Sequence, residues 1–207
     1  MEFRVDGRLW LERRERTLKE LESHMEAGRV DEDIIGVLNA INSLDYAFTT
    51  SSCSGRIQVY AAREPGDKFG LKTMGKWHRP ISEEELKLTL ESDTESVWLA
   101  VLPPIIHVAV CSIEAAFYLL NLVRTAGFKR AGIISASEDG ITLEAIGTER
   151  MEMPLRLSGI DVVSEKAFPL IVERANSLLI RSKTRIGRLE EVLRDEAARG
   201  LDNLCGK

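Results

Sequence analysis

The densest group of reactive side chains in this sequence is the run TTSSCSGR, from Thr49 to Arg56. It holds five hydroxyl groups, one thiol and one guanidinium within eight residues. Backbone N–H groups and Ser hydroxyls in such a run donate hydrogen bonds to carboxylate or phosphate oxygens, and Arg adds a two-pronged charged donor. The run therefore indicates an anion-binding site. The alternative is an ordinary hairpin turn whose Ser side chains bond to their own backbone.

Cys53 lies inside this run, but no base lies near it in the sequence, so we interpret it as a packing residue rather than a nucleophile. The three cysteines, Cys53, Cys111 and Cys205, are too few and too widely spaced for a disulfide framework. None belongs to a C-x-x-C pair, and no metal site is predicted. This cysteine usage favours a reducing, cytosolic environment.

A second candidate is the segment 63–80, which has three more basic than acidic residues and contains Phe69, Trp77 and His78. Base stacking combined with phosphate contacts uses this mixture. The alternative is a solvated surface loop. A further basic run lies between Arg174 and Arg188. The basic residues of the segment 63–80 are Arg63, Lys68, Lys72, Lys76 and Arg79.

The helices that must position these groups follow from apolar spacing. Steps of three, four and seven residues predict a helix over 9–25, and Asp31 is expected to cap a helix that ends near Ser43. Ser82 and Glu85 form a capping-box pattern, and Ser112 should cap a helix that stops at Gly127. The last helix is expected over 168–198, with a break near residue 187.

The strands are expected in hairpins. Residues 46–50 and 56–61 should pair across the Ser-rich run, and 132–137 should pair with 141–146. Residues 97–102 and 105–111 indicate two strands, or one bent strand, around Pro103 and Pro104. Residues 151–157 indicate another strand. In this strand context, a His such as His107 is more often a hydrogen-bonded core residue than a catalyst.

These elements predict an α+β fold: a mixed or antiparallel sheet with flanking helices, in a single domain over 1–207. The similarity of TTSSCSGRIQVY to IISASEDGITLEA suggests a duplicated α-β-β unit, with pseudo-repeat halves 30–95 and 97–182. Neither a Gly-rich fingerprint between a strand and a helix nor a Walker loop is present, which argues against a Rossmann-type methyltransferase or nucleotide fold.

Composition limits the function classes. The chain has 207 residues, 44% of them hydrophobic and 29% charged, as in ordinary globular domains. Its net charge of -5 argues against a generic polyanion binder, so any nucleic-acid contact must use local patches. The charged N-terminus is unlike an export signal, and the apolar stretch 97–123 is interrupted by Pro and charged residues, so we expect no membrane span.

The run TTSSCSGRI, from Thr49 to Ile57, resembles the signature of the tRNA wybutosine-synthesizing protein 3 family, the N4-methyltransferases of wyosine-base biosynthesis. Other landmarks follow in the family's order over nearly the whole chain. They are VDED at 30–33, Trp77 with His78, His107 with Val108, GFKRAGI at 127–133 and MEMPL at 151–155.

The resemblance implies methyl transfer from S-adenosylmethionine to N4 of 7-aminocarboxypropyl-demethylwyosine at position 37, in the anticodon loop of phenylalanine tRNA. It implies a cytoplasmic enzyme and leaves its oligomeric state open. The implied base for the N4 proton is His78, His107 or Asp45. The implied cofactor-binding residues are Thr50, Ser51, Ser52, Ser54, Gly55 and Arg56, and the implied nucleic-acid-binding residues are Lys68, Lys72, Lys76, Trp77 and Arg79.

Two alternatives remain at this point. A non-catalytic accessory protein that presents the modified anticodon loop would explain the basic aromatic segment without a cofactor site. A methyltransferase for small molecules would act without tRNA.

Overall fold

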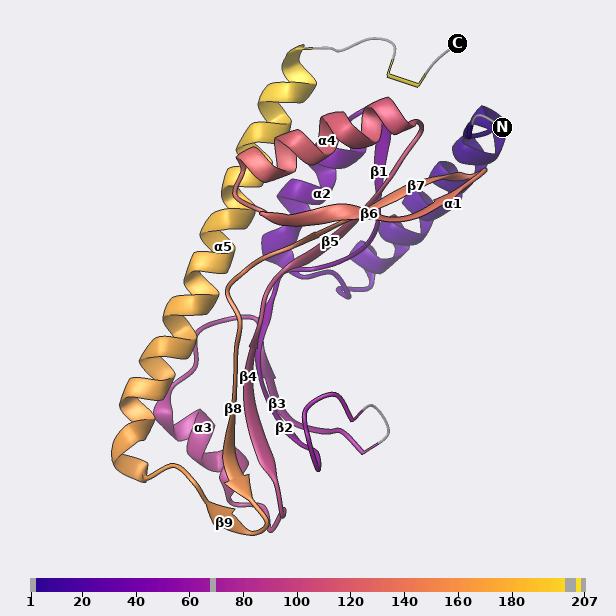
Figure 1. Cartoon of the computed structure of the whole chain (residues 1–207). Coiled ribbons are helices and arrows are strands. Elements are labelled where there is room, and N and C mark those ends of the chain that lie inside the picture. Colours follow the sequence, from indigo (N-terminus) through magenta and orange to yellow (C-terminus); the bar gives the residue numbers. More distant parts are fainter. Residues whose placement is uncertain (1–2, 68–69, 200–203, 206–207) are drawn as a thin grey trace. The chain divides into compact units, whose positions relative to one another are not determined.

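A computed structural model describes residues 3–67, 70–199, 204 and 205. The chain contacts divide it into two compact units that interleave along the sequence. The first unit comprises Met1–Ser54, Pro104–Thr148 and Thr184–Lys207, and the second comprises Gly55–Pro103 and Glu149–Lys183. Each unit contains one antiparallel sheet with helices packed on it (Figure 1).

The sheet of the first unit has the strand order β1-β5-β7-β6. Its strands are β1 (Ala47–Cys53), β5 (Ile105–Val110), β7 (Gly140–Ile146) and β6 (Arg130–Ser137). The helices α2 (Ile35–Asn42) and α4 (Ile113–Thr125) pack on the face that carries Val108 and Leu143, and they share one apolar core with it. A short 3-10 helix, η1 (Glu32–Ile34), precedes α2.

The helix α1 (Gly7–Glu26) covers part of the opposite face of this sheet. The Trp10 ring lies 5.6 Å from the Phe48 ring, and the Arg13 guanidinium lies over Phe48 and donates to the Thr142 hydroxyl. Phe48, Ala109 and Thr142 share this face because they are paired across neighbouring strands. The helix therefore shields one end of the face and leaves the other end open.

The second unit has the strand order β3-β2-β4-β8-β9. The helix α3 (Glu83–Leu90) and the first part of α5 (Phe168–Arg199) pack on one face of the sheet, around a core that includes Ile57, Leu99 and Leu179. A 3-10 helix, η2 (Glu165–Ala167), precedes α5. The strands are β3 (Lys72–Trp77), β2 (Arg56–Ala61), β4 (Val97–Leu102), β8 (Met151–Leu157) and β9 (Ile160–Asp161).

The predicted α+β class is confirmed, as are several local signals. The Ser82–Glu85 capping box is present, Ser112 accepts from the Ala115 N–H at 3.0 Å, and Gly127 follows α4 with φ +102°. The hairpin of β6 and β7 is also formed. These features are local, so a few consecutive residues contain the information that specifies them.

The predicted hairpin across the Ser-rich run is wrong. β1 pairs with β5, whereas β2 pairs with β3 and β4 in the other sheet. β3 lies within the segment 63–80, where no strand was expected, and α5 continues through Gly187 without a break. The buried neighbours Ile186 and Leu189 offset the helix cost of that glycine, which is only ~1 kcal/mol. The pseudo-repeat halves stay a prediction.

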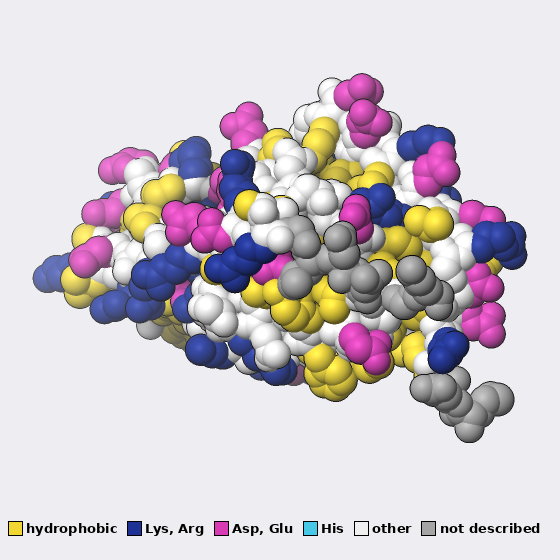
Figure 2. Space-filling view, turned by 90° about the horizontal axis from the view of Figure 1, so that it is seen from above, with side chains coloured by type: hydrophobic (Ala, Val, Ile, Leu, Met, Phe, Trp, Pro, Cys, Tyr) yellow, Lys and Arg dark blue, Asp and Glu magenta, His cyan; other side chains and the backbone are white. Residues whose placement is uncertain are grey.

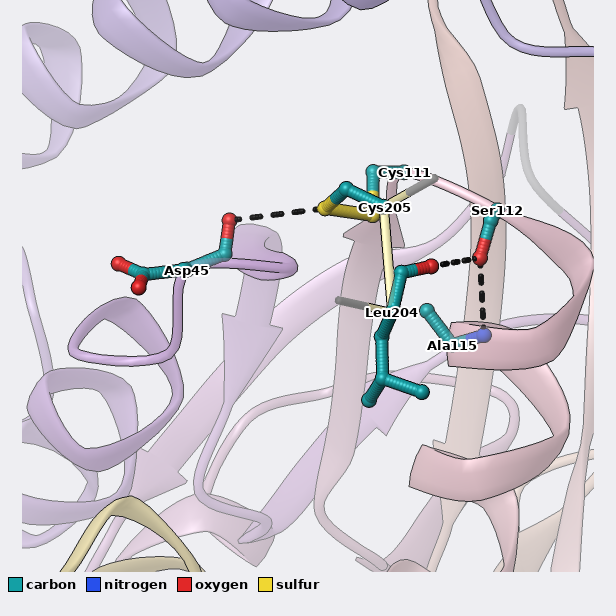
Figure 3. The surroundings of a disulfide bond; sticks show 6 residues. All are labelled: Asp45, Cys111, Ser112, Ala115, Leu204 and Cys205. Carbon is teal, nitrogen blue, oxygen red and sulfur yellow. Dashed lines mark hydrogen bonds between the residues drawn. A yellow bond between two sulfur atoms is a disulfide. The ribbon is translucent and has the colours of Figure 1, made fainter. Parts of the chain in front are cut away.

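A disulfide joins Cys111 to Cys205, although the cysteine spacing gave no sign of it (Figure 3). The two Cα atoms lie 5.3 Å apart across a sequence separation of 94 residues. The neighbouring Ser112 Oγ donates to the Leu204 carbonyl oxygen at 2.5 Å while it caps α4. The Cys205 sulfur lies 4.0 Å from the Asp45 carbonyl oxygen, a contact without a hydrogen bond because a disulfide sulfur carries no proton.

Removal of this disulfide should destabilise the protein. The crosslink closes a loop of 94 residues, and the chain-entropy relation assigns about 4 to 5 kcal/mol to a loop of this size. We expect Cys205→Ser to lower the urea midpoint of unfolding under oxidising conditions. Dithiothreitol should lower the midpoint of the wild type by the same amount. Equal midpoints for the oxidised wild type and Cys205→Ser would contradict a stabilising crosslink.

Candidate functional site

The signature run does not form one turn. Its residues up to Ser54 belong to the first unit, and those from Gly55 onward belong to the second. Thr49 to Cys53 are part of β1, and Arg56 opens β2. Between the strands, Gly55 has φ +82°, a backbone conformation that other residues rarely adopt. The candidate site residues are therefore held mainly by strand pairing.

Thr49 is anchored to the last residue of α2. Its backbone N–H and its hydroxyl donate to the Asn42 side-chain oxygen, at 2.8 and 3.1 Å. Thr49 is buried, so these bonds satisfy polar groups that would otherwise cost free energy. They fix the point at which β1 leaves regular pairing.

Asp31 holds the far end of the run. Its Oδ2 accepts from the backbone N–H of Ser54 at 3.1 Å and from the Ser54 hydroxyl at 2.9 Å. The expected N-cap bond of Asp31 is absent from the described residues around η1. Ser54 is fully buried, so its two donors serve the fold.

A β-bulge directs Ser51 toward His107. Thr49 pairs with Val108 and Ser52 pairs with Ile106, so Thr50 and Ser51 together oppose His107. In regular pairing Ser51 would face away from His107, because successive strand residues alternate between faces. With the bulge, Ser51 Oγ lies 2.7 Å from His107 Nδ1.

Glu144 completes a chain of three hydrogen-bonded side chains. It is the register partner of His107 on β7, and its Oε2 lies 2.9 Å from His107 Nε2. The side chains of His107 and Glu144 are 25% and 31% exposed, at the end of the sheet face that α1 does not cover. A chain of hydroxyl, imidazole and carboxylate fixes the ring and supports proton transfer.

The other predicted bases lie elsewhere. Asp45 precedes β1, beside the Cys111–Cys205 bond (Figure 3). The Cys111 N–H donates to the Tyr46 carbonyl, so Asp45 lies about five strand positions, or ~16 Å, from His107. His78 follows β3 in the second unit. Neither is part of the chain around His107.

Two further side chains of β1 differ in their partners. The Ser52 Oγ is buried and has no hydrogen-bond partner among the described residues. Cys53 is a free, half-buried thiol. Within the described ranges, no group of three His, Cys, Asp or Glu residues is arranged to hold a metal ion.

In the second unit, Arg56 begins a polar row on the sheet face opposite α3 and α5. Its Nε donates to Gln58 Oε1 at 3.0 Å, and Gln58 donates on to Thr73 at 3.2 Å. The two terminal nitrogens of Arg56 make no hydrogen bond within the described part of the chain. The guanidinium is thus oriented by Gln58 and keeps donors for an anion.

The predicted nucleic-acid residues fall into different environments. Lys72 and Lys76 are exposed on the edge strand β3. Lys76 pairs with Gln58 and lies on the face of Arg56, whereas Lys72 pairs with Ala61 and lies on the face where Trp77 packs against the core. Arg79 donates to both carboxylate oxygens of Glu85, at 2.7 and 3.0 Å. This bond holds the pKa of Glu85 at about 2. Lys68 lies outside the described residues.

Basic and acidic side chains both lie on the face of the molecule that Figure 2 draws. On the face drawn in Figure 2, Lys and Arg side chains are interspersed with Asp and Glu. This mixture agrees with the net charge of -5. With this mixture, an anionic partner can be held only by a local group of basic side chains.

Sequence reasoning missed Glu144, Asn42 and the real role of Asp31. A signal existed only for Glu144, the one charged residue in the otherwise largely apolar strand GITLEAI. The other two act through contacts that the sequence does not reveal. Asn42 looks like any polar helix end, and Asp31 looks like an N-cap.

The chain is similar in sequence to proteins that are named as tRNA methyltransferases. A relative from Thermococcus sibiricus is 41% identical over 179 residues, which cover 86% of this chain and 91% of the relative. A relative from Pyrococcus furiosus is 43% identical over 171 residues, 82% of this chain and 87% of the relative. Both are named tRNA(Phe) 7-((3-amino-3-carboxypropyl)-4-demethylwyosine(37)-N(4))-methyltransferase, the second with the suffix 1.

Solved structures show the same fold. The PH1069 protein from Pyrococcus horikoshii superposes with a TM-score of 0.85 at 40% identity, over 89% of this chain and 96% of that one. A hypothetical protein from Aeropyrum pernix gives 0.73 at 30% identity, over 80% and 98%. The family model described as Methyltransferase TYW3 matches residues 12–195. The chain therefore belongs to the TYW3 methyltransferase family.

Proposed function

We propose that this protein methylates N4 of 7-aminocarboxypropyl-demethylwyosine at position 37 of phenylalanine tRNA, with S-adenosylmethionine as methyl donor. The observation that carries the proposal is the family match over 12–195, together with relatives above 40% identity that are named for this reaction. Position 37 belongs to the anticodon loop, so the partner is that loop of the tRNA. A tRNA substrate supports a cytoplasmic location.

The signature run fits a methyl donor with an amino-acid end. S-adenosylmethionine supplies an activated methyl group on a sulfonium, so the enzyme has mainly to bind and align. Among the described residues, the Ser52 hydroxyl and the terminal nitrogens of Arg56 have no hydrogen-bond partner, and each is a donor of the kind that binds a carboxylate. We assign cofactor binding to Thr50, Ser52, Gly55 and Arg56. Ser54 shapes the segment, and Ser51 is bonded to His107.

Among the proposed bases, His107 has the best support. Its ring is hydrogen-bonded on both nitrogens and partly exposed on an open sheet face. Asp45 adjoins the disulfide instead, and His78 stays a second proposal.

No helix in the described ranges is long and apolar enough to span a bilayer.

Two measurements test the function. Isothermal titration should show that the protein binds S-adenosylmethionine, and mass spectrometry of tRNA nucleosides should show one added methyl group on the demethylated base. Absence of cofactor binding would favour the accessory tRNA-binding protein. Methylation of the free nucleoside as fast as of tRNA would favour a small-molecule enzyme.

Arg56→Ala should weaken S-adenosylmethionine binding by ~1.5 to 3 kcal/mol, because it removes a charge-assisted hydrogen bond to the cofactor. Ser52→Ala should weaken it by ~0.5 to 1.5 kcal/mol, since a neutral hydroxyl contributes less. Calorimetry measures both, with Arg63→Ala as the matched exposed control. Wild-type affinity in both site variants would remove the signature run from the cofactor site.

The exposed lysines of β3 should contact tRNA phosphates. The double variant Lys72→Gln/Lys76→Gln is expected to reduce the slope of log K against log salt by ~1 to 2, since each phosphate contact contributes ~0.7 to 0.9. Fluorescence anisotropy with labelled tRNA measures the slope. Lys87→Gln on α3, whose charge lies 3.9 Å from Glu83, is the control. An unchanged slope in the double variant would place the RNA surface elsewhere, for example along the basic run 181–188.

Cys53→Ser should retain methyl transfer within about tenfold, or ~1.4 kcal/mol of barrier. The reason is that a sulfonium passes its methyl group directly to nitrogen, and no base adjoins Cys53. Single-turnover rates with the modified tRNA measure the effect. A methylated Cys53 trapped during turnover would show that the thiol relays the group.

A further inference from the structure

With a neutral His107 ring and a Glu144 carboxylate, the three linked side chains of the first unit have one consistent arrangement of protons. A carboxylate accepts hydrogen bonds only. His107 Nε2, 2.9 Å from Glu144 Oε2, must therefore carry the ring proton. In the neutral imidazole Nδ1 is then an acceptor, and the Ser51 hydroxyl 2.7 Å away donates to it.

This arrangement fixes the orientation of the Ser51 hydroxyl group. Because its proton points at His107, its oxygen presents both lone pairs away from the ring. Ser51 is also exposed, whereas the ring behind it is bonded on both nitrogens and only 25% exposed. The group that meets an incoming N–H at this place is therefore the Ser51 oxygen rather than the imidazole.

We propose that Ser51 Oγ accepts the proton released by the methylated nitrogen, that His107 receives the proton of Ser51, and that Glu144 is the positioning residue that keeps His107 in the Nε2–H tautomer. The inference rests on the proposed function. It assigns a role to Glu144, a residue of β7 that lies outside the signature run. It gives Ser51 a role in proton transfer in place of the cofactor binding that the family resemblance implies.

The step balances. The reacting nitrogen uses an electron pair to form the new N–C bond, and the pair of the broken S–C bond leaves with sulfur. The N–H electrons stay on nitrogen while its proton moves to Ser51 Oγ, and the original Ser51 proton moves to His107 Nδ1. The resulting imidazolium is stabilised by the Glu144 carboxylate and returns its proton to water through the exposed part of the ring.

The backbone supports this assignment over a purely structural one. A regular β1 strand would turn Ser51 to the other face, and the bulge that prevents this lies between Thr49 and Ser52, directly opposite His107. Bulges of this kind re-aim side chains and occur often beside active sites. The Asn42 bonds to Thr49 hold the strand where the bulge begins.

Activity measurements test the proton step. At saturating cofactor and tRNA, Ser51→Ala should lower kcat by ~10² to 10⁴ with little change in cofactor affinity, and Ser51→Thr should restore most of it. Glu144→Ala should lower kcat by ~10 to 100, as removal of a supporting partner does. Ser135→Ala and Glu138→Ala, exposed positions on β6 and in its turn, are the controls.

A spectroscopic measurement tests the tautomer without any turnover. Nitrogen-15 NMR of the neutral His107 ring should show Nε2–H in the wild type and in Glu144→Gln, whose amide oxygen still accepts. In Glu144→Ala the tautomers should mix. Urea midpoints identify any variant that fails to fold. If Glu144→Ala fails to fold, Glu144→Gln is compared with the wild type instead, and we expect it to have a lower kcat and the same His107 tautomer.

The outcomes separate the two ideas. A wild type that methylates tRNA while Ser51→Ala keeps full kcat, or loses only cofactor affinity, overturns the proton role of Ser51. An Nδ1–H ring in the wild type overturns the role of Glu144. A wild type that methylates nothing overturns the proposed function and the proton step with it, and the NMR result still decides whether Glu144 sets the tautomer.

Discussion

The pairing of β1 with β5 is the interaction on which the candidate site depends. It places the signature run in the first unit's sheet and leaves β2 to pair with β3 and β4. Its register, interrupted by one bulge, makes Ser51 and Thr50 share a single partner, His107. Because side chains alternate along a strand, a regular register would separate the hydroxyl from the imidazole.

Two buried polar contacts hold that pairing in place. Asn42 satisfies the donors of Thr49 before the bulge, and Asp31 satisfies those of Ser54 after it. A buried donor left without a partner costs ~1 to 3 kcal/mol, so these contacts strongly disfavour a shift of the strand. The conformation of the serine-rich run therefore depends on Asp31, which precedes η1, and on Asn42, the last residue of α2.

The two units hold different polar groups. The first unit holds the hydrogen-bonded side chains of Ser51, His107 and Glu144, while the second carries the Arg56 guanidinium, oriented by Gln58. A direct methyl transfer needs alignment and a proton acceptor, and it needs neither a metal nor a covalent intermediate.

The sequence by itself determined the local features: the α+β class, the Ser82–Glu85 capping box, the Ser112 cap, the β6–β7 hairpin, and the run TTSSCSGRI that indicates the family. Each is encoded in a few neighbouring residues. Only the tertiary structure decided the partner of β1, the bulge, Glu144 as the partner of His107, and the Cys111–Cys205 disulfide. The physical reason is that strand register and crosslinks depend on contacts between distant residues, and a shift of one residue, which no local pattern records, exchanges the two faces of a strand.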